Sequence, residues 1–113
     1  MKAVLDEGVP RQLIPVLLKA GCRVDPFPNR WKGLKNGQLL ERLAREGFEC
    51  LVTSDRSMRY QQNLNALGPA VVVLPGQTLD ELTSLAAEIS ATISTARMGV
   101  LVEMPRPGLR PKP

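Results

Sequence analysis

The run from Ala70 to Leu74, AVVVL, constrains the fold more than any other stretch of the chain. It contains no polar residue and is rich in β-branched side chains, which is typical of a strand buried on both faces of a parallel sheet. Gly68 and Pro69 interrupt the chain just before it. Because parallel strands are joined by crossover connections, usually helices, the run predicts a chain in which strands and helices alternate.

Other short apolar runs and helical stripes complete this alternation. Further strands are expected at residues 2–5, 23–27, 50–52 and 100–103, the last at an edge of the sheet. Helices are expected at residues 10–20, 36–46 and 78–97, with a short helix after Asp55. Asn36 is expected to cap the second of these helices, and Thr78 with Glu81 forms a capping box for the last.

This pattern predicts a single α/β domain over residues 1–103. Its mostly parallel sheet of four or five strands would lie between two layers of helices. Residues 104–113 contain four prolines and three basic residues, so we expect a flexible tail there.

The composition limits both the location and the chemistry of the protein. The chain has no histidine, which excludes serine or cysteine mechanisms that use imidazole as the base. Its two cysteines lack the paired spacing of a zinc site. No apolar run approaches the roughly 20 residues of a membrane span, and the N-terminus does not resemble a signal peptide. A cytoplasmic protein without a membrane anchor is therefore expected, with any chemistry carried by carboxylates, a metal ion or lysine.

Basic residues are concentrated in the middle of the chain. Three of the fifteen Lys and Arg residues lie in the tail, and the remainder of the chain is close to neutral. Residues 30–59 nevertheless carry seven basic side chains against four acidic ones. Such a segment forms either a surface that meets phosphates or an ordinary solvated helix face.

Acidic residues follow two of the expected strands. Asp6 and Glu7 close the first strand, and Asp55 comes shortly after residues 50–52. Ligands bind at the carboxyl ends of strands in open α/β sheets, so these carboxylates would converge if the two strands are neighbours. Two or three carboxylates suit Mg²⁺ or Mn²⁺, ions that support phosphodiester hydrolysis. Each acid also has a purely structural interpretation, as a helix cap or a turn residue.

Four segments together resemble a known family. The segments LDEGVP, KNGQLL, FECLVTSDRSMRYQQNL and AVVVL resemble the short PIN-like proteins often grouped with the toxins of bacterial toxin–antitoxin systems. The resemblance covers residues 2–96, and the family pattern reads LDENLP, NGELL and TxDxNLxYQQNL. It implies a nuclease that cuts RNA with Mg²⁺ or Mn²⁺ held at Asp6 and Asp55, with Glu7 as a further catalytic residue. An antitoxin protein would be a second partner.

Polar and basic residues around these acids are expected to bind the RNA. The arginines would contact backbone phosphates, and the amide side chains would orient the substrate. The expected substrate-binding residues are Arg11, Asn36, Gln38, Arg56, Arg59, Gln62 and Asn63.

The sequence departs from the family pattern at two positions. Gln38 stands where the family motif has glutamate, and Ser57 stands where more distant relatives have another acid. Glu41, three positions after Gln38, either replaces the missing ligand or pairs with Arg45 on the helix surface.

Three functions therefore remain to be weighed. The leading one is a metal-dependent endoribonuclease, and the second is a non-catalytic PIN-like module that binds RNA or a protein. A phospho-accepting receiver domain is disfavoured because the AVVVL strand ends in Pro75, with no lysine there to pair with a phosphorylated aspartate. A homodimer is expected only because it is the commonest symmetric assembly.

Overall fold

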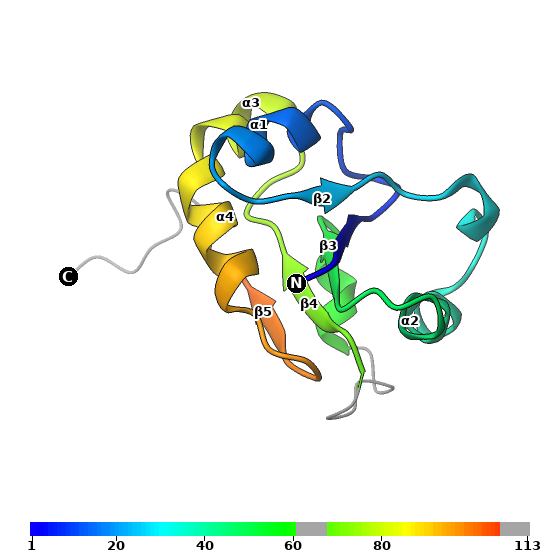
Figure 1. The fold of residues 1–113 in the computed structure, drawn as a ribbon. Coiled ribbons are helices and arrows are strands. Elements are labelled where there is room, and N and C mark those ends of the chain that lie inside the picture. Colours follow the sequence, from blue (N-terminus) through cyan, green and yellow to red (C-terminus); the bar gives the residue numbers. More distant parts are fainter. Residues whose placement is uncertain (61–67, 107–113) are drawn as a thin grey trace.

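A five-stranded, all-parallel sheet forms the centre of the protein. The computed structural model describes residues 1–60 and 68–106, with the backbone alone at 59–60. The sheet has the order β2-β1-β3-β4-β5 (Figure 1). The strands are β1 (Ala3–Leu5), β2 (Val24–Asp25), β3 (Cys50–Thr53), β4 (Ala70–Val73) and β5 (Leu101–Glu103). The expected α/β fold is confirmed.

Helices cover both faces of this sheet and give a three-layer domain (Figure 1). Helices α1, α3 and α4 lie on one face, and α2 lies on the other. Two 3₁₀ turns, η1 and η2, lie on the same side as α2. The bounds are α1 (Leu13–Lys19), η1 (Asn29–Trp31), α2 (Asn36–Arg45), η2 (Arg56–Tyr60), α3 (Leu79–Ser84) and α4 (Ala86–Thr95). Within the described residues, no helix is long and apolar enough to cross a membrane.

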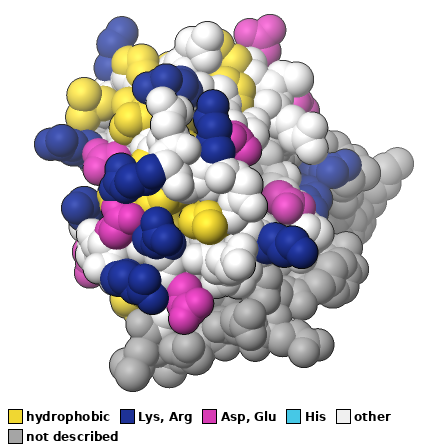
Figure 2. Space-filling model, turned by 90° about the vertical axis from the view of Figure 1, so that its right-hand side faces the viewer, with side chains coloured by type: hydrophobic (Ala, Val, Ile, Leu, Met, Phe, Trp, Pro, Cys, Tyr) yellow, Lys and Arg dark blue, Asp and Glu magenta, His cyan; other side chains and the backbone are white. Residues whose placement is uncertain are grey.

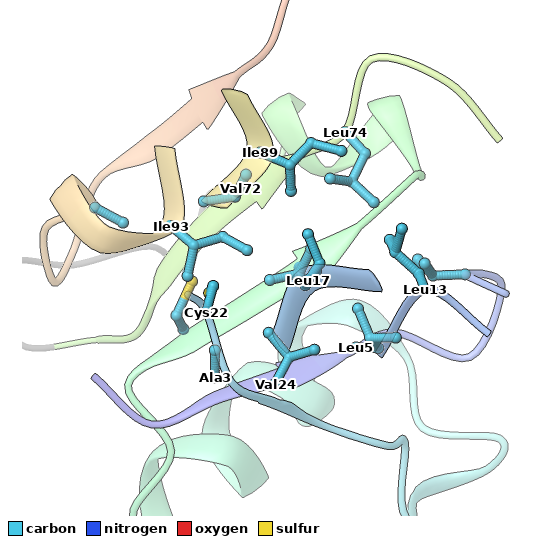
Figure 3. Packing of buried hydrophobic residues seen from close by; sticks show 14 of the residues in the cluster. Ala3, Leu5, Leu13, Leu17, Cys22, Val24, Val72, Leu74, Ile89 and Ile93 are labelled. Carbon is cyan, nitrogen blue, oxygen red and sulfur yellow. The ribbon is translucent and has the colours of Figure 1, made fainter. Parts of the chain in front are cut away.

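The AVVVL run shows why every residue of strand β4 has to be apolar. Side chains alternate between the two faces of a strand, so a strand covered on both sides needs apolar residues at every position. Val72 and Leu74 belong to the cluster beneath α1 and α4 (Figure 3). Val71 and Val73 belong to the opposite cluster, beneath α2. Both faces of β4 are therefore completely buried.

The single helix expected over residues 78–97 is instead two helices. Helix α3 ends at Ser84, and α4 begins at Ala86. Leu85 between them has φ −112° and ψ 18°, and its N–H bonds to the carbonyl of Leu82, three residues back. This tight closure turns the chain, and both short helices pack against α1.

Two helix starts also differ from those expected. Helix α1 begins at Leu13, because the carbonyl of Pro10 accepts a hydrogen bond from the Leu13 N–H in a preceding turn. The cap residue of α2 is Lys35, and Asn36 is already helical. The Lys35 N–H donates to Gln38 Oε1 over 3.1 Å, so the side chain of the third helical residue reaches back to the cap residue, as in one half of a capping box. The capping box of Thr78 and Glu81 is present as expected.

Candidate active site

The strand order places β1 and β3 next to each other at the point where the sheet is extended in opposite directions. Strand β1 pairs with β2 on one side and with β3 on the other, in parallel. The connections that leave such a pair diverge, which opens a crevice at the carboxyl ends of the strands. Asp6 directly follows β1, and its N–H bonds to the carbonyl of Val52 in β3 over 2.8 Å. Asp55 lies two residues beyond the end of β3.

Thr53, the last residue of β3, links the two aspartates. Its hydroxyl donates a hydrogen bond of 2.6 Å to Asp6 Oδ2. The same oxygen accepts a hydrogen bond of 3.1 Å from the Asp55 N–H. Because Thr53 is completely buried, this hydroxyl has a fixed position between the ends of the two strands. Asp6 and the backbone of Asp55 therefore lie at the same edge of the sheet, and the convergence of their two carboxylates stays a prediction.

Each aspartate also receives hydrogen bonds from its own neighbours. Asp6 Oδ1 accepts from the Glu7 N–H over 2.8 Å. Asp55 Oδ1 accepts from both the N–H and the hydroxyl of Ser57, over 2.9 and 2.6 Å. Asp6 is half-buried, whereas Asp55 and Glu7 are exposed. Asp55 therefore begins the η2 turn, as a cap would, and at the same time presents its carboxylate to solvent.

Asp6 and Asp55 are the candidate ligands for a metal ion. Among the described residues, no three His, Cys, Asp or Glu side chains form a group that could hold one. Mg²⁺, however, commonly keeps several waters and binds through one or two protein carboxylates together with substrate phosphates. A metal site built on Asp6 and Asp55 would therefore need waters or substrate oxygens as its other ligands.

The remaining expected residues near β1 lie on the surface. Glu7 and Arg11 are both exposed, and neither forms an ion pair within the described ranges. Glu7 directly follows Asp6 in the chain, so its side chain leaves the backbone next to the candidate site. Arg11 lies in the turn before α1, and its carbonyl accepts a hydrogen bond from the Ile14 N–H.

In the described part of the chain, no hydrogen bond or ion pair joins the expected residues of α2 to the aspartates. Gln38 uses its side-chain oxygen to hold the start of α2, as described above. Asn36 is half-buried in the first turn of the helix. Glu41 is exposed and lines, together with Gln38, a hollow of about 180 Å³ on the helix surface. The proposed replacement of a metal ligand by Glu41 gains no support from this placement.

Arg56 binds the protein itself. Its guanidinium lies 3.4 Å from the carboxylate of Glu103, at the end of β5. It also donates to the carbonyls of Leu74 and Met104, over 3.5 and 3.4 Å. The expected role of Arg56 as a phosphate contact therefore competes with a role in tying together the ends of β4 and β5.

The chain matches no family model, no curated protein and no solved structure. The interpretation of the site therefore rests on its residues and their geometry. Three further expected residues extend beyond what the structure describes, namely the side chain of Arg59 and the whole of Gln62 and Asn63.

An open groove of about 690 Å³ starts beside Asp55. Ser54 and Arg56, the two neighbours of Asp55, line one end of it. Gly76 and Thr78, between β4 and α3, form another wall, where the Ser54 hydroxyl donates to the Gly76 carbonyl over 2.9 Å. The groove is large enough for a small ligand or part of a polymer.

Sequence reasoning missed two residues of this site. Thr53 lies just after the expected strand at residues 50–52 and received no role, and Ser57 was noted only as a missing acid, although the first bonds Asp6 and the Asp55 backbone and the second bonds the Asp55 carboxylate. A signal for Thr53 was present, because a polar residue ends an otherwise apolar buried strand just before an aspartate. A buried hydroxyl requires a hydrogen-bond partner, and the nearby acids are the natural ones.

Proposed function

We propose that this chain is a small PIN-like endoribonuclease that uses Mg²⁺ or Mn²⁺. The observation that carries the proposal is the bridge formed by Thr53, which joins Asp6 and Asp55 across neighbouring strands. The sequence resemblance supports it independently, since the motif containing Thr53 and Asp55 is the part most similar to the PIN-like pattern. In this proposal the protein acts in the cytoplasm, and its toxicity would be controlled by an antitoxin protein.

Each residue of the site has a distinct part in this proposal. Asp6 and Asp55 would hold the ion, which when bound activates a water and stabilises charge on the phosphodiester. Thr53 and Ser57 orient the two carboxylates by donating to them. Glu7 and Arg11, both exposed beside Asp6, are available to assist and to contact phosphate respectively.

A second function is favoured by one specific observation. Two carboxylates are a small set for catalysis, and no third acidic ligand completes a group among the described residues. The side chain of Gln38, which replaces the family's glutamate, is instead used to start α2. A module that binds RNA without cutting it would retain the fold and the crevice and need no complete metal site.

Metal titration separates these two functions. Calorimetry with Mn²⁺ should show binding to the wild type that is lost in Asp55→Asn and in Asp6→Asn. Glu88→Gln provides a matched control, because it removes one exposed carboxylate from α4 without touching the site. Absence of binding at millimolar Mn²⁺, or an equal loss in the control, would contradict the metal site.

Cleavage is then measured on single-stranded RNA. The wild type should cut in Mg²⁺ or Mn²⁺ and not in EDTA, and Asp6→Asn should be inactive. Cutting that survives in Asp6→Asn would identify a contaminating nuclease. Metal binding without cutting would favour the second function.

A further inference from the structure

The outer side of α2 and the loop before it carry a group of cations on the face of the protein opposite α4. We call this group the α2 basic face, defined by Lys32, Lys35, Arg42 and Arg45. All are exposed except Arg42, which is half-buried. Figure 2 shows the side of the molecule that bears α2, with Lys and Arg side chains spread widely over it among acidic ones. The leucine stripe of α2 points the other way, into the core.

Within residues 1–58 and 68–106, none of these four cations forms an ion pair. The ion pairs of the described residues are Arg23 with Asp25, Arg30 with Glu46, and Arg56 with Glu103. None of them includes a member of the α2 basic face.

The nearest acids, Glu41 and Glu46, reduce this positive charge without cancelling it. Glu46 is bound by Arg30 and by the Trp31 indole N–H, and these hydrogen bonds lower the pKa of its carboxyl group. Glu41 then stands beside Arg42 and Arg45 in the shallow hollow on α2. The face keeps an excess of positive charge that can attract an anionic partner.

The absence of apolar anchors identifies the kind of partner. Among the described residues, the exposed large apolar side chains are Met1, Leu18, Met98 and Val100, and none lies on this face. Protein interfaces depend on a few buried aromatic or aliphatic anchors, whereas phosphate backbones are bound by cations alone. Trp31 is completely buried and offers no ring for base stacking. The chemistry therefore suits the backbone of a nucleic acid, read without base specificity.

The direction of α2 connects this face with the candidate active site. Because the strands are parallel, α2 must return the chain from their carboxyl edge to their amino edge. Lys35 thus lies toward the edge that carries Asp6 and Asp55. Arg45 lies at the far end of a helix of ten residues, about 15 Å away at 1.5 Å per residue.

We infer that the α2 basic face binds the phosphate backbone of single-stranded RNA. The contact would be made where the RNA leaves the crevice beside Asp6 and Asp55. The identity of the ligand rests on the proposed function, whereas the location rests on the charge and direction of α2. The contacts are electrostatic and independent of base sequence, so affinity depends steeply on salt.

The test measures binding without cleavage. Fluorescence anisotropy of a labelled single-stranded oligouridylate is recorded in EDTA at several KCl concentrations. The variant Arg42→Gln/Arg45→Gln removes two charges from the face, and Lys19→Gln/Arg97→Gln removes two exposed charges from the opposite helix layer as a control. Urea unfolding of all proteins verifies that they are folded.

The α2 variant should bind about tenfold more weakly at low salt. The slope of log affinity against log salt is negative, and its magnitude should be smaller by about 1.4 in this variant, at about 0.7 for each lost phosphate contact. The control should stay within about twofold of the wild type. Unchanged binding by the α2 variant, equal losses in the control, or no RNA binding by the wild type would overturn the inference. The last result would leave an acidic protein as the partner of this face.

The same assay separates this inference from the proposed nuclease function. Asp6→Asn and Asp55→Asn should keep RNA binding in EDTA even where cleavage is lost. RNA binding that depends on α2 in a protein that never cuts would support the α2 basic face and contradict the nuclease. RNA cleavage that is unchanged in the α2 variant would support the nuclease and contradict the α2 basic face.

Discussion

The hydroxyl of Thr53 donates a 2.6 Å hydrogen bond to Asp6 Oδ2, joining residues 47 positions apart in the chain. The same hydroxyl accepts from the backbone of the loop that carries Asp55. A short, charge-assisted and partly buried hydrogen bond holds its partners firmly. The geometry of the candidate site therefore depends on a residue that would not itself need to contact substrate.

Replacement of Thr53 by valine tests this dependence. Valine keeps the β-branched shape but removes the hydroxyl, which leaves the Asp55 N–H and Asp6 Oδ2 without their partner. We expect the free energy of unfolding to fall by about 1–3 kcal/mol and Mn²⁺ affinity to weaken. Urea unfolding and calorimetry measure the two effects. Thr53→Ser, which restores the hydroxyl, should recover most of the metal affinity, and a valine variant that binds Mn²⁺ like the wild type would contradict the bridge.

A third carboxylate can be added at Ser57. Its hydroxyl now donates to Asp55 Oδ1, so the side chain of Ser57→Asp would lie beside Asp55. Without metal the two like charges should repel and lower stability, and with Mn²⁺ they should bind the ion together. We expect tighter Mn²⁺ binding and a larger gain in melting temperature on adding Mn²⁺ than in the wild type. Ser57→Asn is the neutral control, and equal gains in both variants would mean that Asp55 does not face the ion.

The Arg56 and Glu103 pair is expected to stabilise the carboxyl edge of the sheet. Both side chains are less than one-third exposed, and Arg56 also binds two carbonyls. In a double-mutant cycle of Arg56→Gln and Glu103→Gln, each single change should lower stability by about 1–3 kcal/mol, with a coupling energy of about 1 kcal/mol. The more exposed pair of Arg23 and Asp25 is the matched control, with a coupling too small to measure. Additive effects at Arg56 and Glu103 would instead leave Arg56 free for the phosphate role.

The fold followed from patterns that repeat along the sequence. The AVVVL run is apolar at every position because both faces of its strand are covered, and the leucines of α2 recur on the one face that packs against the sheet. The alternation of strands and helices and the burial of these residues were therefore predictable. The break at Leu85 was not, because residues on both sides of it follow a helical pattern. What ends α3 is the closure of Leu85 onto the Leu82 carbonyl and the packing of two short helices against α1. Such packing leaves no local signal in the sequence.

The acidic residues of the candidate site were predictable from the sequence, but the contacts that hold them were not. Asp6 and Asp55 could be placed at strand ends, but their adjacency required β1 and β3 to be neighbours, which the sequence alone left as a condition. Arg56 was expected to face a ligand because it lies in a basic segment. The structure instead joins it to Met104, 48 residues away, through a contact that no spacing rule contains.

The buried thiol of Cys50 predicts how stability changes in alkaline solution. Burial first, and then the nearby Cys22, raise the pKa of Cys50 to about 12 from an ordinary value of 9.0. The unfolded chain therefore ionises this thiol at lower pH than the folded protein does. Its contribution to stability is complete below pH 9 and is lost progressively as the pH rises from 9 toward 12.

We expect the free energy of unfolding of the wild type to fall with a steeper slope above pH 9 than that of Cys50→Ala. The difference between the two slopes should approach about 1.4 kcal/mol per pH unit, the limit for one proton. Lysine and tyrosine also titrate in this range, but they are common to both proteins and cancel in the comparison. Urea unfolding in a reducing buffer at pH 8, 9 and 10 measures both slopes. Parallel slopes would show that Cys50 ionises in the folded protein as readily as in the unfolded chain, which its complete burial in β3 opposes.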